Sequence, residues 1–174
     1  MKYLMLTYQD LVFLVPKGWK PSDPRPKKFM VFFNNKYEAE DACLFLRSRV
    51  SRKAQEYIKW FYASMSTFYR SEEIKLFKTG ESQYGLELTD VGGMVSSFQH
   101  ISDRNCTNLA QRIDLPDIQI IVQWKVPTDL NTLMQRFGHG VRNPSLMGIT
   151  ILITEPWYFY DEHQKSVRRR AGHK

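Results

Sequence analysis

The fold is decided by the stretch KFMVFF, residues 28–33, which Asn34 and Asn35 bring to an end. A strand with one wet face alternates apolar and polar residues, so this unbroken apolar run indicates a β-strand covered on both faces. The apolar residues that follow have the spacing of one helix face: Ala39, Ala42, Cys43, Leu46 and Val50. We therefore expect a β-strand followed directly by an amphipathic helix.

The same alternation continues along the chain. Further strands are predicted at 58–62, 84–89, 118–124 and 147–154. Helices are predicted from the capping residue Ser66 to about Lys78, and from about Asp129 to Phe137. Strands that alternate with helices predict the α/β class, here a doubly wound, mainly parallel sheet with helices on both faces. Ligands of such sheets bind at the carboxyl ends of the strands.

Composition and charge narrow the functional classes. The 174 residues are 43% hydrophobic and 14% aromatic, which is enough for one packed domain. The net charge of +7 and the pI of about 9.4 favour a polyanionic partner. No apolar stretch approaches the ~20 residues of a membrane helix, so we expect no membrane partner and an intracellular protein. The two cysteines, Cys43 and Cys106, do not have the spacing of zinc ligands, and we expect no metal site.

We divide the chain into three segments. Residues 1–27 are expected to form an irregular lead-in, because four prolines lie between positions 16 and 26. A short buried segment at 11–15 is expected within it. Residues 28–156 are expected to form the domain. Residues 157–174 form a basic tail that could contact phosphates or serve as a nuclear address, although a solvated terminal helix is an equal alternative.

Polar and glycine residues gather where we expect the carboxyl ends of the strands. They are Thr89-Asp90, Pro116-Asp117 and the stretch QRFGHGVR at 135–142. Glycines at 138 and 140 would let the backbone turn so that Arg136 and Arg142 can bind a phosphate with two hydrogen bonds each. The alternative is an ordinary solvated basic turn.

Several motifs, taken in order, resemble the second RecA-like domain of superfamily-two helicases, and among these the RecQ-like group. They are KFMVFF with its helix, WFYASM at 60–65 followed by Arg70, TDVGGM at 89–94, IDLPDI at 113–118 and the 135–142 stretch. The resemblance covers about residues 28–155. It implies a RecA-like fold and the C-terminal half of an ATP-dependent 3′-to-5′ DNA helicase, with a nuclear location.

The same resemblance implies that half of the motor lies outside this sequence. Neither GxxxxGK[ST] nor a DExH-type run occurs in the 174 residues. ATP and Mg²⁺ are therefore implied only together with a first RecA-like domain, and we expect the chain alone to bind neither and to be inactive. The implied partners are that first domain and single-stranded DNA.

Carried over position by position, the resemblance assigns roles to individual residues. It implies that Thr89 binds a DNA phosphate and that the turn at Asp90, Gly92 and Gly93 presents backbone amides to it. It places Asp114 near the sugar of the nucleotide. It assigns the catalytic motif to Gln135, Arg136 and Arg142, with Arg142 as an arginine finger toward the γ-phosphate. From the residues alone, the favoured interpretation is an ordinary strand end for Thr89 and a turn residue before Pro116 for Asp114.

Two departures from the family pattern weaken the catalytic expectation. His139 stands where the GRxxR pattern has arginine, and imidazole cannot offer the planar fork of a guanidinium. Residues 95–111 separate GGM from IDLPD, and their removal restores the register of the family. We interpret this segment as a retained intron translated in frame, with a genuine surface loop as the alternative.

Two other functions compete with the broken helicase. The first is a non-catalytic, helicase-derived module that binds nucleic acid through its basic face. The second is a Rossmann-type dinucleotide enzyme, which the lack of a glycine fingerprint disfavours.

Overall fold

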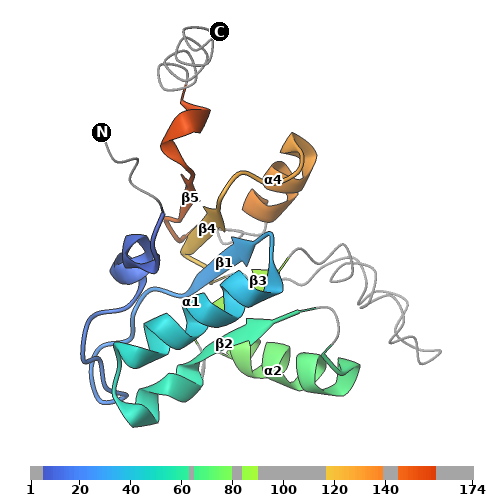
Figure 1. Cartoon of the computed structure of the whole chain (residues 1–174). Helices are drawn as coiled ribbons and strands as arrows, with labels where there is room; N and C mark the ends of the chain where they lie inside the picture. Colours follow the sequence, from blue (N-terminus) through green and yellow to red (C-terminus); the bar gives the residue numbers. More distant parts are fainter. Residues whose placement is uncertain (1–5, 63–64, 80–83, 90–116, 139–144, 160–174) are drawn as a thin grey trace, which may run out of the picture.

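The computed structural model describes residues 6–62, 65–79, 84–89, 117–138 and 145–159. Within these ranges a single sheet is formed by five strands (Figure 1): β1 (Phe29–Phe33), β2 (Ile58–Phe61), β3 (Gly85–Thr89), β4 (Ile120–Trp124) and β5 (Ile149–Ile153). Every strand pair is parallel, and the order across the sheet is β2-β3-β1-β4-β5. The predicted doubly wound α/β architecture is confirmed, and the sheet is wholly parallel.

Helices cover both faces of the sheet. Phe29, Val31 and Phe33 of β1 share one core cluster with residues of α1 (Lys36–Ser48). Met30 and Phe32, which point to the opposite face, share the second cluster with residues of α2 (Thr67–Thr79) and α4 (Leu130–Phe137). All five residues of β1 are buried for this reason, which explains the unbroken apolar run in the sequence.

The predicted helix starts are confirmed by their caps. Ser66 Oγ accepts a hydrogen bond from the backbone N–H of Tyr69 at the start of α2. Asp129 Oδ1 accepts one from the N–H of Thr132 at the start of α4, at 2.8 Å. These hydrogen bonds hold the pKa of the Asp129 carboxyl below its usual range. Each cap satisfies a backbone donor that lacks a partner within its helix.

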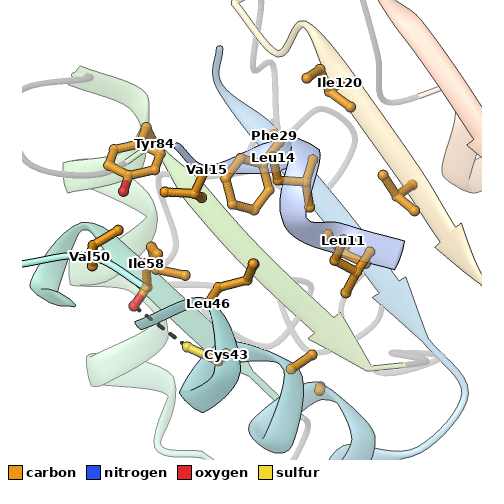
Figure 2. Packing of buried hydrophobic residues seen from close by; sticks show 14 of the residues in the cluster. Leu11, Leu14, Val15, Phe29, Cys43, Leu46, Val50, Ile58, Tyr84 and Ile120 are labelled. Carbon is orange, nitrogen blue, oxygen red and sulfur yellow. Dashed lines mark hydrogen bonds between the residues drawn. The ribbon is translucent and has the colours of Figure 1, made fainter. Parts of the chain in front are cut away.

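The N-terminal part is more regular than its prolines indicate. Residues Tyr8–Leu14 form a 3₁₀-helix, η1, and Leu11, Leu14 and Val15 are buried against the sheet beside Phe29 (Figure 2). The prolines come after this turn, so they do not interrupt it. Two further 3₁₀-helices are η2 (Arg52–Tyr57) and η3 (Pro156–Tyr158). The expected buried segment at 11–15 is therefore part of the main core, except that Phe13 faces outward with 49% of its surface exposed.

The edge strand β5 is the least covered strand. Among the described strands it pairs only with β4, and Ile149 and Leu152 are exposed although they are apolar. Among the helices that the structure describes, none has the length and apolar character needed to cross a membrane.

Candidate functional site

The carboxyl ends of the parallel strands meet at one edge of the sheet, which we call the carboxyl edge (Figure 1). Thr89, the last residue of β3, pairs with Phe33 at the end of β1. Asn34 follows Phe33, and Gln123 of β4 pairs with Phe32. The topology therefore brings together polar residues from positions distant in the sequence, as expected for a doubly wound sheet. Thr89 is 7% exposed, so its side chain is mostly covered at this edge.

Arg136 lies inside the protein rather than on its surface. Its guanidinium donates hydrogen bonds to the side-chain oxygen of Gln123 and, at 3.3 Å, to that of Asn34. It also lies over the ring of Phe32, 5.5 Å from the ring centroid. Only 5% of Arg136 is exposed. The residue therefore connects α4 to the ends of β1 and β4.

Further hydrogen bonds tie this edge together. The side-chain amide of Asn34 donates to the carbonyl oxygen of Val126 at 2.8 Å. Lys125 has a positive φ of 64°, and its ammonium forms an ion pair with Glu38 of α1. A non-glycine residue in the left-handed region costs of order 1–3 kcal/mol, which surrounding contacts must offset. The loop after β4 is thus held against the start of α1.

The predicted site residues divide into two groups. Thr89, Gln135 and Arg136 lie in the described part of the chain, and Gln135 is exposed on α4 next to the buried Arg136. The other predicted residues lie outside the described residues: Asp90, Gly92, Gly93, Asp114 and Arg142. The segment 95–111, His139 and the tail residues from 160 onward also lie outside them. That Asp114 and Arg142 both lie at the nucleotide stays a prediction.

Sequence reasoning missed a cluster of one lysine and two tyrosines at the same edge. Lys36 and Tyr37 are the first residues of α1, and Tyr62 follows β2 directly. The ammonium of Lys36 lies 4.9 Å from the ring centroid of Tyr37 and 5.9 Å from that of Tyr62. Tyr37 is 63% exposed. The signal in the sequence was a tyrosine as the last residue of the predicted strand 58–62 and another just after the predicted strand 28–33, where the following helix begins.

The expectation that Pro116-Asp117 lies at a carboxyl end is wrong for Asp117. This residue precedes β4, so it lies at the opposite, amino edge of the sheet. Both oxygens of its carboxylate accept hydrogen bonds from the Lys28 ammonium, at 2.9 and 2.8 Å. Lys28 precedes β1 and is buried, with its ammonium 4.4 Å from the ring centroid of Phe77. This ion pair links the starts of β1 and β4 and is remote from the carboxyl edge.

Glu87 and Cys43 are reactive groups enclosed in the core. Glu87, in the middle of β3, is fully buried, and burial raises the pKa of its carboxyl well above the usual range. Burial likewise raises the pKa of the Cys43 thiol, which donates a hydrogen bond to the carbonyl oxygen of Ile58 (Figure 2). Neither group reaches solvent, so both belong to the interior and not to a site.

The described residues do not provide a complete nucleotide site. Within them, no group of three His, Cys, Asp or Glu side chains could hold a metal ion. The sequence also lacks a phosphate-binding loop, and that the chain alone binds neither ATP nor Mg²⁺ stays a prediction. What the carboxyl edge offers is aromatic, cationic and hydrogen-bonding groups.

Comparison with solved structures finds helicase domains of the same architecture. Domain 2 of the DEAD-box helicase Mss116p, solved bound to an RNA duplex, is 22% identical with a TM-score of 0.55, over 73% of this chain and 42% of that one. The E. coli DEAD-box protein SrmB, solved bound to the regulator of ribonuclease activity A, is 21% identical with a TM-score of 0.51, over 76% and 65%. A hypothetical ATP-dependent RNA helicase from Sulfolobus tokodaii is 16% identical with a TM-score of 0.55, over 90% and 36%.

These matches establish the fold. The chain has the RecA-like fold that these helicase structures share, as predicted, and it spans between 36% and 65% of the length of these three neighbours. No protein-family model and no curated protein matches the sequence. The three neighbours are DEAD-box proteins or an RNA helicase, so the RecQ-like and DNA-specific part of the resemblance stays a prediction.

Proposed function

We propose that this chain is the second RecA-like domain of a helicase-type motor. In this proposal it binds single-stranded nucleic acid along its carboxyl edge. The observation that carries the proposal is the convergence of Thr89, Asn34 and the Lys36 cluster at this edge of a RecA-like sheet. The net charge of +7 favours contact with a phosphate backbone. The Mss116p domain that shares this fold was solved on an RNA duplex, which supports a nucleic-acid partner.

In this proposal the roles of the motif residues differ from one another. Arg136 acts as a positioning residue, because it holds α4 on the sheet through Gln123 and Asn34 and is shielded from solvent. Gln135 and Arg142 are the residues proposed to reach toward a nucleotide held by a separate first RecA-like domain, with Asp114 near its sugar. Thr89 and the turn at 90–93 are proposed to hold a phosphate of the bound strand.

The finer assignment rests on the sequence motifs. We propose a RecQ-like DNA helicase with 3′-to-5′ polarity and a nuclear location, because the order and spacing of TDVGGM, IDLPD and QRFGHGVR favour it. A non-catalytic nucleic-acid-binding module is the second candidate. It is favoured by His139, which replaces an arginine of the family pattern.

Binding to labelled oligonucleotides tests the proposal. Fluorescence anisotropy with single-stranded DNA and RNA of equal length, at two salt concentrations, should show affinity that falls steeply as salt rises. Replacement of Lys36 with Ala, at the carboxyl edge, should weaken binding and reduce the salt dependence. Replacement of Lys27 with Ala, an exposed lysine just before β1 at the amino edge, is the matched control and should change binding little.

The outcomes separate the candidates. Tighter binding of DNA than of RNA supports the DNA assignment, and the reverse order contradicts it. An affinity that does not depend on salt contradicts the carboxyl-edge site. A loss of affinity in the Lys27 control as large as that in the carboxyl-edge variant contradicts it as well. Stimulation of the ATPase of an added first RecA-like domain supports the motor half, whereas binding without stimulation supports the non-catalytic module.

A further inference from the structure

The side chains of the Lys36 cluster (Lys36, Tyr37 and Tyr62) are held in place by the surrounding structure. Asn35 caps α1, and its side-chain oxygen accepts a hydrogen bond from the backbone N–H of Tyr37 at 2.8 Å. The backbone that carries Lys36 and Tyr37 is therefore fixed at the carboxyl edge. Tyr62 comes from a different element, directly after β2, and yet its ring lies near the same ammonium group.

The charge and the exposure of this cluster fit one kind of ligand. In the described part of the chain, Lys36 forms no ion pair, so its only described partners there are the two rings. Tyr37 is 63% exposed and Tyr62 is half-buried, which leaves ring surface open to solvent. A free ammonium attracts phosphate, and an exposed tyrosine ring offers a flat surface on which a base can stack.

We propose that Tyr37 and Tyr62 bind bases of a single-stranded nucleic acid by stacking, while Lys36 between them binds the adjoining phosphate. This inference rests on the proposed function and deepens it. A strand bound only through its phosphates would bind with an affinity that does not depend on its bases. A strand bound at the Lys36 cluster would be bound through its phosphates and its bases. It would have to be unpaired, because the bases of a duplex are already stacked on each other.

The test uses the full chain and a fluorescently labelled oligothymidylate, with circular dichroism to verify that each variant folds. Tyr37→Ala and Tyr62→Ala should each weaken binding about fivefold or more, the range that loss of one stacked base produces. Tyr37→Phe keeps the ring and should bind as the unaltered chain does. Phe13→Ala removes an exposed aromatic ring on η1 and is the matched control, expected to leave affinity unchanged.

Two further measurements separate stacking from phosphate contact. An abasic deoxyribose-phosphate strand of the same length should bind equally to the unaltered chain and to Tyr37→Ala. Lys36→Gln should reduce the salt dependence by about one counterion, whereas Tyr37→Ala should leave it unchanged. A 2-aminopurine base in the strand should change its fluorescence on binding to the unaltered chain and less on binding to Tyr37→Ala.

The failures are distinguishable. If the chain binds single strands but both alanine variants bind within twofold of it, the stacking inference is overturned and the proposed function stands. If Tyr37→Ala weakens binding of the abasic strand as much as binding of the oligothymidylate, the stacking inference is also overturned, because the abasic strand has no base to stack. If the unaltered chain binds no single-stranded DNA or RNA at low salt, the proposed function is overturned and this inference falls with it.

Discussion

The guanidinium of Arg136, in the last turn of α4, donates a hydrogen bond to the side-chain oxygen of Gln123 on β4. A charged group is thereby placed in the interior, where only a polar partner makes its burial tolerable. The register places Gln123 beside Phe32, over whose ring Arg136 lies. One arginine thus joins a helix to two neighbouring strands at the end where ligands of this fold bind.

Loss of the Arg136 guanidinium should destabilise the protein. Arg136→Met keeps an unbranched apolar side chain at this position but leaves the buried side-chain oxygen of Gln123 without this donor. We expect the free energy of unfolding to fall by about 1–3 kcal/mol, the cost of one orphaned buried acceptor. Urea denaturation measures it. Gln135→Met, one residue away on the exposed side of α4, is the control and should change stability by less than about 0.5 kcal/mol.

Glu87 should make stability fall as pH rises. Burial raises the pKa of its carboxyl in the folded protein, so folding takes up a proton. The stability that this group contributes is fully present below the unfolded pKa, about 4.3, and is lost as pH rises toward the folded pKa. Glu87→Gln cannot ionise and should gain in stability over the unaltered chain as pH rises from 4 to 8. A difference independent of pH in urea denaturation would contradict this.

Gly85 should not tolerate a side chain. It opens β3 directly beside Phe29 in the parallel register, and a Cβ atom there would lie 2.4 Å from the Phe29 ring. Gly85→Ala should therefore cost about 1–3 kcal/mol through overpacking. Phe29→Leu in the same chain removes the clashing ring atoms, so the double variant should lose less than the two single changes added together. Additive losses would show that the two residues do not compete for space.

The chain alone should not hydrolyse ATP. The sequence has neither a phosphate-binding loop nor a DExH-type run. A coupled phosphate-release assay with single-stranded DNA present should give background turnover only. Turnover above background that disappears in Arg142→Ala would show that this chain assembles a nucleotide site without a first RecA-like domain.

The sheet was predictable because burial on both faces leaves a direct mark on the sequence. The apolar run at 28–33 predicts a strand that is covered on both faces. Ser66 and Asp129 mark the starts of the helices that they cap. The order of the strands was not predictable in the same way. Which strand pairs with β1 depends on crossover connections, and no local pattern records that β3 and β4 both lie beside it.

The site was predicted only in outline. The predicted helix that ends at Phe137 is confirmed as α4 and carries Gln135 and Arg136, but the burial of Arg136 depends on Gln123 and Asn34, which are distant in sequence. The burial of Glu87 could not be predicted, because one carboxylate within a strand does not indicate whether that face of the sheet is exposed to solvent or covered. The Lys36 cluster was missed because Tyr37 and Tyr62 come near the same ammonium group only once β1 and β2 lie in one sheet.

The wholly parallel order of the sheet has a consequence for how the molecule forms. In β1, Phe29 pairs with Gly85 on one side and with Ile120 on the other, so one ladder cannot form fully until residue 89 has been made and the other until residues 120–123 have been made. Contacts of such long sequence separation make folding slow, since large loops must close before any pairing compensates for their lost entropy. During synthesis the apolar residues 29–33 therefore emerge long before their partners. Until β3 and β4 have been made, the apolar residues of this strand lack their partners, and exposed surface of this kind is what chaperones protect.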